Sequence, residues 1–420
     1  MKKILYFILR FFAKAIIKKY RPKVIGITGS VGKTSAKEAI FAVVKQDWRT
    51  RQSFKNYNNE IGLPLTILGR ESAGKNIFSW LRIFLAGFCL LIVKNKEYPQ
   101  ILVLEMAADR PGDIDYLTSI AKPDIAVITA VGSSHLEHFG SIDNIIKEKS
   151  SILKLLTAKD YVILNNDDQQ VAALADKTRA QVLTFGYQDQ KSDVQLSDLK
   201  IIKQTHTYGT TFELRCQDNL LPIFLANILG RQHALAAAAA TTVGLILSME
   251  PAKIQSGLLK YRPAPGRTNL LQGIKNSWII DDTYNSSPLS ARLAIDILRE
   301  IESQGHRIAV LGDMLELGAV TEQEHQDLGR YLVAKEIDYL FIVGERARDI
   351  RRGAIRAGMD EDKIYHFPFT VEAGLFLQDR IKEGDVILVK GSRGMKMEQV
   401  VYEIMAKPWK AKELLVGSVK

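Results

Sequence analysis

The sequence predicts an α/β protein with two sheet domains: a doubly wound, mostly parallel central sheet and a C-terminal Rossmann-like α/β domain, preceded by a short amphipathic helix. From residue 24 onward, short apolar runs alternate with segments of helical periodicity. Many of these runs are apolar at every position, which is typical of parallel strands buried on both faces. A glycine-rich turn joins the first run to a helical segment, so the central sheet is expected to be of the P-loop type.

Composition sets limits on the kind of protein. A chain of 420 residues has room for two or three domains, and 46% hydrophobic with 25% charged residues is ordinary for a globular protein. The 57 basic and 47 acidic residues give a net charge of +10, which favours an anionic partner such as nucleotide phosphates or a membrane surface. Cys89 and Cys216 are the two cysteines, which excludes a disulfide framework and fits a reducing cytosol.

Residues 1–20 are expected to form a basic amphipathic helix. Lysine or arginine recurs every four or so positions among aliphatic and aromatic residues, so the segment cannot span a bilayer but could lie in its surface. Two alternatives stay open. The segment could be a signal peptide, since Ala13-Lys14-Ala15 loosely resembles a cleavage site, or a helix packed on its own domain.

The glycine-rich turn is predicted to bind a nucleotide. It reads Gly29-Ser30-Val31-Gly32-Lys33-Thr34-Ser35. Gly29 and Gly32 allow the backbone N–H groups and the following helix N-terminus to approach a polyphosphate. Lys33 is expected to neutralise the terminal phosphates, and the hydroxyl of Thr34 or Ser35 to bind magnesium. Ile27 stands where the commonest P-loop pattern has glycine.

Strand-like runs at 101–107, 124–132 and 161–168 continue the central sheet, and the polar, β-prone stretch 190–225 predicts a small antiparallel insert. Residues 77–93 are mostly apolar and contain Arg82, which predicts a helix that is either buried or apposed to a membrane.

A stiff link of proline and glycine, Arg262-Pro263-Ala264-Pro265-Gly266, precedes a second series of strand-like runs. These runs are SWIIDD, RIAVLGD, YLFIVG and DVILVKG. We therefore expect three units: the helix 1–22, a central domain 23–263 and a C-terminal domain 264–420.

Polar residues follow two strands of the central sheet at the edge where the glycine-rich loop is expected. Glu105 ends one run and His135 follows another, and a carboxylate and an imidazole there could bind a divalent metal. Lys149 comes fourteen residues after His135 on a helical segment, where a solvated charge is the simplest interpretation.

Together these residues closely resemble the Mur ligase family, the ATP-dependent amide-forming enzymes of peptidoglycan synthesis, and in particular its D-alanyl-D-alanine-adding branch. The resemblance runs from about residue 23 to 402 and rests on separated motifs: GITGSVGKTS, NYNNEIGLPLTIL, LEMAADRPGDI, HLEHFGSIDNIIKEKS, PAPGR, DDTYNSSP, LGDMLELG and KGSRGMKME.

The resemblance implies an enzyme that uses ATP and Mg²⁺ to activate a peptide carboxylate as an acyl phosphate, which an amine then attacks. It implies metal ligation by Thr34, Glu105, His135 and a carbamylated Lys149, with Lys33, Lys149 and His135 as the catalytic residues. The implied nucleotide contacts are Gly29, Ser30, Gly32, Lys33, Thr34, Ser35, His233, Arg267 and Asp282, and the implied substrate contacts are Asn58, Asn59, Asn285, Ser392 and Arg393. The expected substrates are a peptidoglycan precursor and D-Ala-D-Ala, with no nucleic acid, for a monomer in the cytoplasm.

Three departures from the family pattern leave alternatives open. The family's N-terminal domain, which holds the UDP-sugar end of the acceptor, has no counterpart before the loop at residue 26. The segment 230–240 and the Ser286-Ser287 pair also differ from the usual residues. A ligase resembling folylpolyglutamate synthase, one with a lipid-linked acceptor, and a non-catalytic, membrane-tethered nucleotide-binding scaffold therefore remain as alternatives.

Overall fold

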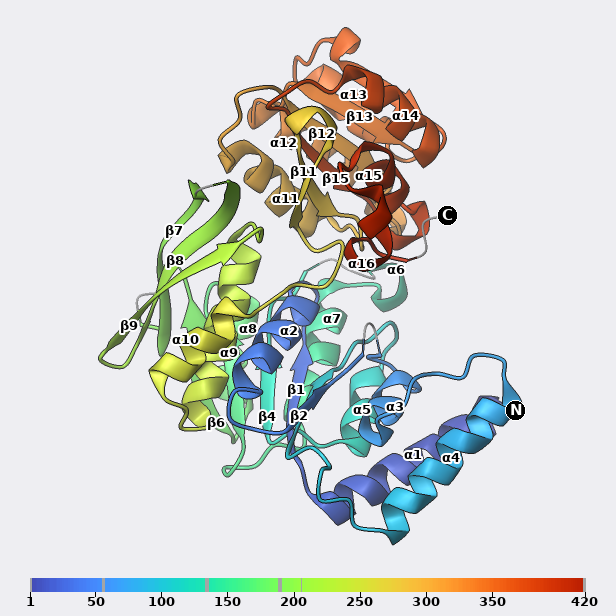
Figure 1. Ribbon diagram of the computed structural model, residues 1–420, viewed down its shortest axis with the longest axis vertical. Coiled ribbons are helices and arrows are strands. Elements are labelled where there is room, and N and C mark those ends of the chain that lie inside the picture. Colours follow the sequence, from blue (N-terminus) through green and yellow to red (C-terminus); the bar gives the residue numbers. More distant parts are fainter. Residues whose placement is uncertain (1, 55–56, 133–135, 188–190, 205, 418–420) are drawn as a thin grey trace.

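The computed structural model describes residues 2–54, 57–132, 136–187, 191–204 and 206–417. This part of the chain forms two sheets, each covered by helices, with the first in the lower half of Figure 1 and the second in the upper half. The predicted α/β fold class is confirmed.

The first sheet has nine strands in the order β2-β3-β1-β4-β5-β6-β7-β8-β9. They are β1 (Lys23–Thr28), β2 (Thr50–Gln52), β3 (Ile101–Glu105), β4 (Ile125–Ile128), β5 (Tyr161–Asn165), β6 (Gln181–Gly186), β7 (Val194–Gln204), β8 (Thr207–Cys216) and β9 (Asn219–Ala226). Neighbouring strands are parallel from β2 to β7 and antiparallel from β7 to β9. The antiparallel segment expected at 190–225 therefore continues the main sheet and is not a separate insert.

Helices cover both faces of this sheet because its central strands are apolar on both sides; β3 and β4 are buried at every position. The helices are α1 (Lys2–Tyr20), α2 (Lys33–Val44), α3 (Gly62–Leu68), α4 (Ile77–Ile92), α5 (Asp113–Ile120), α6 (Leu136–Phe139), α7 (Ile142–Ser150), α8 (Gln169–Ala172), α9 (Arg231–Ile246) and α10 (Pro251–Leu259). Residues of α2, α9 and α10 share one apolar cluster, and residues of α1, α3 and α5 share another.

The expected N-terminal helix is present as α1, and one face of it packs on its own domain, where Leu9 and Ile16 are fully buried. The apolar segment 77–93 is also helical. Of the two alternatives for this helix, the buried one is wrong, and the membrane-apposed one stays a prediction. In α4 only Ile83 and Gly87 are buried, because the helix packs beside α1 and α3 at the outer edge of the domain. No helix in the described ranges is long and apolar enough to cross a membrane.

The second sheet has six strands in the order β10-β11-β15-β12-β13-β14, parallel except for the pair β10–β11. They are β10 (Asn269–Gln272), β11 (Trp278–Asp282), β12 (Arg307–Gly312), β13 (Tyr339–Val343), β14 (Ile364–Phe367) and β15 (Val386–Lys390). Its helices are α11 (Pro288–Glu300), α12 (Thr321–Ala334), α13 (Arg348–Arg356), α14 (Thr370–Arg380), α15 (Glu398–Ile404) and α16 (Ala411–Leu414). The four expected strands are confirmed, while the division of the chain at residues 263 and 264 stays a prediction.

Candidate active site

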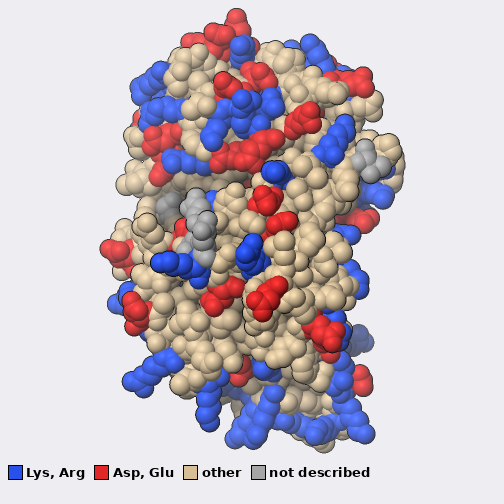
Figure 2. All heavy atoms as spheres, turned by 90° about the vertical axis from the view of Figure 1, so that its left-hand side faces the viewer, with Lys and Arg blue, Asp and Glu red and all other residues tan. Residues whose placement is uncertain are grey.

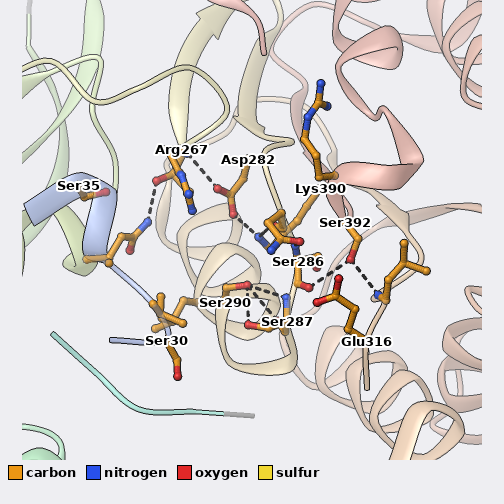
Figure 3. A pocket seen from close by; sticks show the side chains of 18 of the residues that line it. Ser30, Ser35, Arg267, Asp282, Ser286, Ser287, Ser290, Glu316, Lys390 and Ser392 are labelled. Carbon is orange, nitrogen blue, oxygen red and sulfur yellow. Dashed lines mark hydrogen bonds and ion pairs between the residues drawn. The ribbon is translucent and has the colours of Figure 1, made fainter. Parts of the chain in front are cut away.

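A cavity of about 180 Å³ lies between the two sheets, and we refer to it as the interdomain cavity. The glycine-rich loop and the start of α2 line one side through Ser30, Gly32 and Ser35. Asp282 and Lys390, at the ends of β11 and β15, line the other side (Figure 3). The carboxyl ends of parallel strands from both sheets therefore meet at one place, where α/β folds bind ligands.

The loop is held against the end of β4. The backbone N–H of Ser30 donates a hydrogen bond to the carbonyl oxygen of Ala130 at 2.6 Å. Gly29 has a φ of +143°, and a Cβ atom at this position would lie 2.2 Å from Oγ1 of Thr129. A side chain at residue 29 is therefore excluded both by backbone conformation and by space. Gly32, with a φ of +88°, turns the chain into α2.

Lys33 lies within the curve of this loop. Its Nζ atom donates to the carbonyl oxygens of Gly29 at 2.6 Å and Ser30 at 3.2 Å. Burial lowers the pKa of Lys33 from its ordinary value. An ammonium in this position is close to the loop N–H groups, so the same loop can present both backbone donors and a positive charge to an anion.

Four residues distant in sequence meet beside Lys33. The carboxylate of Glu105 accepts hydrogen bonds from the hydroxyl of Thr34 at 3.0 Å and from the side-chain amide of Asn58 at 3.0 Å. Arg267, in the connection between the sheets, donates to Oγ1 of Thr34 at 3.3 Å. Three of the residues predicted around the phosphates and the metal, Thr34, Glu105 and Arg267, thus lie together with Asn58, which was predicted as a substrate contact.

These residues fit a nucleotide and a divalent cation. The buried Nε atom of Arg267 has no hydrogen-bond partner within the described ranges, and a phosphate oxygen would supply one. The hydroxyl of Thr34 and the carboxylate of Glu105 are hard oxygen ligands of the kind that Mg²⁺ prefers. Where the chain is described, no three His, Cys, Asp or Glu residues form a group that could hold a metal ion. His135 lies outside the described residues.

Lys149, on α7, is buried, so the interpretation of this residue as a solvated helix charge is wrong. Its Nζ atom lies 3.4 Å from the carbonyl oxygen of Ala108. Burial, and secondarily the charge of Lys33, lowers the pKa of Lys149 to about 7. Near neutral pH a larger fraction of this amine is therefore uncharged than in an ordinary lysine, and the uncharged form can react as a nucleophile.

His233 does not contact the interdomain cavity, and the expectation of a direct nucleotide contact is not met. Its side chain, in the first turn of α9, is fully buried. Its Nδ1 lies 2.7 Å from the hydroxyl of Tyr261, and its Nε2 lies 2.8 Å from Oγ1 of Thr268 and 2.9 Å from the carbonyl oxygen of Arg267. Burial lowers the pKa of His233 to about 4, as expected for a neutral histidine in a core. Its neighbour Gln232 lines the cavity instead.

On the side of the second sheet, Lys390 is the central residue. Its Nζ atom forms an ion pair with Asp282 at 2.6 Å and donates to the carbonyl oxygen of Asn285 at 2.8 Å. Asn285, Ser392 and Arg393 line the cavity as expected, although Arg393 is also paired with Glu398 at 2.8 Å. Figure 3 places Ser392 beside Ser286 on the side opposite the loop.

Asn59 belongs to a different surface. Its side-chain oxygen accepts from the backbone N–H of Gly62 at 3.0 Å, which orders the start of α3. Together with Asn58 it lines a cavity of about 500 Å³ that is closed on one side by α1. We call this the α1 cavity.

Sequence reasoning missed a second pocket next to the loop. This pocket, of about 470 Å³, extends from Val31 and Gly32 to polar residues after β5 and to Arg231 at the start of α9. Arg231 forms an ion pair with Asp167 at 2.7 Å. The rule that found Glu105, a polar residue directly after an apolar strand, also applies to Asn165, Asp167 and Asp168, and to Lys390 after β15.

Comparisons with known proteins agree with this geometry. Residues 87–244 match the Mur ligase middle domain, and residues 266–393 match the Mur ligase, glutamate ligase domain. The chain is 32% identical over 400 residues to the UDP-N-acetylmuramoyl-tripeptide–D-alanyl-D-alanine ligase of Bacillus subtilis (strain 168), covering 95% of this chain and 79% of the relative. Its counterpart in Escherichia coli (strain K12) is 29% identical, with coverage of 90% and 76%.

A solved structure is similar along nearly the whole chain. The MurF ligase of Thermotoga maritima in complex with ADP has a TM-score of 0.78 and 30% identity, covering 94% of this chain and 82% of that one. The similarity therefore concerns both the sequence and the arrangement of the two sheets that carry the loop, Glu105 and Lys149. The chain belongs to the Mur ligase family and is an ATP-dependent ligase.

Proposed function

We propose that this ligase adds D-alanyl-D-alanine to the peptide of a UDP-MurNAc-tripeptide-type acceptor, with conversion of ATP to ADP and phosphate. The relatives from B. subtilis and E. coli carry the name of this reaction. One observation supports the proposal most strongly: beside Lys33 lie Thr34, Glu105, Asn58 and Arg267, joined by hydrogen bonds. This arrangement combines groups that bind phosphate with oxygen ligands for Mg²⁺.

In this proposal the glycine-rich loop and two positively charged side chains, Lys33 and Arg267, bind the nucleotide. The backbone from Gly29 to Ser35 would bind the phosphates, Lys33 and Arg267 would neutralise their charge, and Asp282 would contact the ribose. Bound ATP supplies the phosphoryl group that activates the acceptor carboxylate as an acyl phosphate, and Mg²⁺ offsets the charge that develops. Thr34, Glu105 and a carbamylated Lys149 would hold the metal, together with His135 as the sequence predicts.

The carbamate on Lys149 forms without a further reactant beyond carbon dioxide. The neutral amine attacks the carbon of CO₂, a C–N bond forms, and one proton leaves the nitrogen. A cation is thereby replaced by a carboxylate-like anion. A pKa of about 7 supports this role, because an ordinary lysine would be almost entirely protonated at neutral pH.

The second sheet brings the amine substrate to the activated carboxylate. Asn58 and Asn59 bind on the acceptor side, and Asn285, Ser392 and Arg393 bind on the side of the incoming amine. Approach of the two sheets across the interdomain cavity orients the reacting groups and keeps water from the acyl phosphate.

We further propose that the enzyme acts as a monomer in the cytoplasm, does not bind nucleic acid, and contacts the inner face of the membrane through residues 1–20.

Phosphate release from ATP tests the proposed reaction. With D-Ala-D-Ala and UDP-MurNAc-tripeptide together, we expect release that depends on both, with one new amide per phosphate by mass spectrometry. Parallel assays contain a lipid-linked acceptor, or folate with glutamate. Turnover with folate and glutamate alone, or the absence of turnover with either cell-wall acceptor, would contradict the proposal.

A further inference from the structure

The outer side of α1 and α4 collects exposed hydrophobic residues. Of the 24 large hydrophobic side chains exposed in the described part of the chain, ten lie on α1, on α4 or directly after α4. They are Ile4, Phe7, Phe11, Ile77, Phe78, Leu81, Leu85, Phe88, Ile92 and Val93. We call this set the α1–α4 face. A monomeric protein rarely exposes so many neighbouring apolar groups unless they contact something.

Helical spacing places these residues on defined stripes. On α4 they recur at intervals of three or four positions from residue 77 to 92, opposite the buried residues Ile83 and Gly87. The rings of Phe12 and Phe84 stack with centroids 6.3 Å apart, which fixes the two helices to each other. The stripes therefore face away from the protein, at the corner of the molecule farthest from the second sheet (Figure 1).

The positive charge of the whole chain is concentrated around this face. Residues 1–23 and 70–97 contain thirteen Lys and Arg but only two Asp and Glu, a net charge of +11. Because the complete chain carries +10, all other residues together are close to neutral. Lys14, Lys18, Arg82 and Lys94 are exposed on or beside the two helices. The lower end of the molecule in Figure 2 is correspondingly rich in Lys and Arg.

We propose that the α1–α4 face docks on the surface of an anionic phospholipid membrane. Apolar stripes flanked by Lys and Arg are the pattern of a helix that lies at the headgroup boundary, with its apolar side among the acyl chains and its cations on the phosphates. A second copy of this chain is a poorer occupant, because it would bring a second charge of +11 against the first. The proposal extends the contact expected for residues 1–20 to a two-helix surface in which α4 supplies the larger apolar area.

Docking also orients the acceptor side of the catalytic site, a consequence that rests on the proposed function. Tyr6, Phe7 and Arg10 of α1 line the α1 cavity, whose opposite side includes Asn58. Asn58 in turn donates to Glu105. Since Phe7 belongs both to this cavity and to the α1–α4 face, the cavity opens next to the docked surface, and the acceptor reaches the site from there.

Vesicle sedimentation of the intact chain tests the proposal. We expect pelleting with vesicles of phosphatidylcholine mixed with phosphatidylglycerol, and at least about tenfold weaker binding to phosphatidylcholine alone or at high salt. The triple variant Leu81→Gln/Leu85→Gln/Phe88→Gln should bind at least about tenfold more weakly. A matched control, Phe369→Gln/Val371→Gln/Leu375→Gln, removes exposed apolar groups from the second domain and should bind as the unmodified chain does.

Thermal unfolding establishes that each variant is folded, and Phe11→Gln with Ile4→Gln replaces the triple variant if that one is not. Equal pelleting with both vesicle types, no pelleting, or undiminished binding by the folded variants would overturn the proposal. So would a dimer of the unmodified chain that the α4 variant loses, since a second copy would then occupy the face. Phosphate release with dissolved substrates is measured separately, so that failure of ligation is distinguished from failure of docking.

Discussion

The strand ends of the two sheets meet at the interdomain cavity, yet they hold their lysines differently. At the first sheet, Lys33 donates to two loop carbonyl oxygens and Lys149 lies 3.4 Å from another, and burial lowers the pKa of both. At the second sheet, Lys390 is held by the carboxylate of Asp282 at 2.6 Å. Neutral carbonyl groups leave the charge of Lys33 available to an anion and do not hold Lys149 in its charged form, whereas an ion pair compensates the charge of Lys390. We call the strand ends of the first sheet the first edge and those of the second sheet the second edge. The first edge is therefore suited to phosphate chemistry, and the second to keeping the residues around the substrates in fixed positions.

Substitution at the first edge should have the largest effect. Lys33→Ala removes the cation from the loop, and we expect the rate of ATP-dependent phosphate release to fall about 10³-fold, as for the loss of a group that stabilises developing charge. Lys45→Ala, at the exposed end of the same helix, is the matched control and should keep full activity. A fall of less than about tenfold for Lys33→Ala would mean that the loop acts through its backbone alone.

Lys149→Ala is expected to lower the rate about 10²-fold to 10³-fold through loss of the proposed carbamate. Short carboxylates such as formate or acetate should partly restore activity, because they can occupy the same space with the same charge. Lys147→Ala, on the exposed side of α7, is the control. Full activity of Lys149→Ala would refute the carbamate role, whereas a loss without rescue would leave only a packing role.

The pKa of Lys149 also predicts a pH dependence. Carbamate formation from the neutral amine releases a proton, so at fixed dissolved CO₂ its yield should fall as the pH drops. The fall should become steeper below about 7, because the ammonium form must then lose a second proton before it can react. Rate against pH, measured for the unmodified chain and for Lys149→Ala rescued with formate, checks this. The acidic limb should be weaker in the rescued variant, and identical profiles would contradict the assignment.

At the second edge, a substitution should lower the free energy of unfolding more than it slows the chemical step. Asp282→Asn leaves the buried Lys390 without its anionic partner, which should reduce the free energy of unfolding by about 3–5 kcal/mol. We expect the KM for ATP to rise about tenfold through the lost ribose contact, with little change in kcat. Urea unfolding and steady-state kinetics measure the two effects. A kcat loss as large as that of Lys33→Ala would remove the distinction between the two edges.

His233→Ala should have the smallest effect on nucleotide binding. The substitution removes one hydrogen-bond partner from each of the buried hydroxyl groups of Tyr261 and Thr268, which should cost about 1–3 kcal/mol of unfolding free energy. Because His233 does not line the interdomain cavity, the KM for ATP should change less than about threefold in the folded protein. A change in the KM for ATP of tenfold or more would support the direct nucleotide contact that the sequence suggested.

The sequence was most informative at two kinds of position. At one kind only glycine fits the backbone, and at the other a polar residue directly follows an apolar strand. Gly29 could be predicted because the loop has no room for a Cβ atom, and Glu105 because it directly follows an apolar run. The partners of these residues could not be predicted. The bond from Asn58 to Glu105 joins positions 47 residues apart, and no local pattern encodes that distance.

Exposure was the harder property to predict. An apolar stretch such as 77–93 has the same composition whether it is covered or not, and only its position outside α1 leaves Leu81 and Leu85 exposed. The converse holds for Lys149, whose charge suggests solvent although the packing of α7 buries it. His233 belongs with these cases, because burial and its partners Tyr261 and Thr268 follow from tertiary packing and not from its neighbours in sequence.

The edges of the larger sheet bear on how the protein behaves at high concentration. Its two outermost strands are β2, only three residues long, and β9, which contains Pro222. A short strand offers few unpaired backbone groups to another chain, and proline removes a backbone donor from the strand that carries it. Neither edge is a good template for strand addition, so association through the edges of the larger sheet, including growth of fibrillar aggregates from them, is disfavoured.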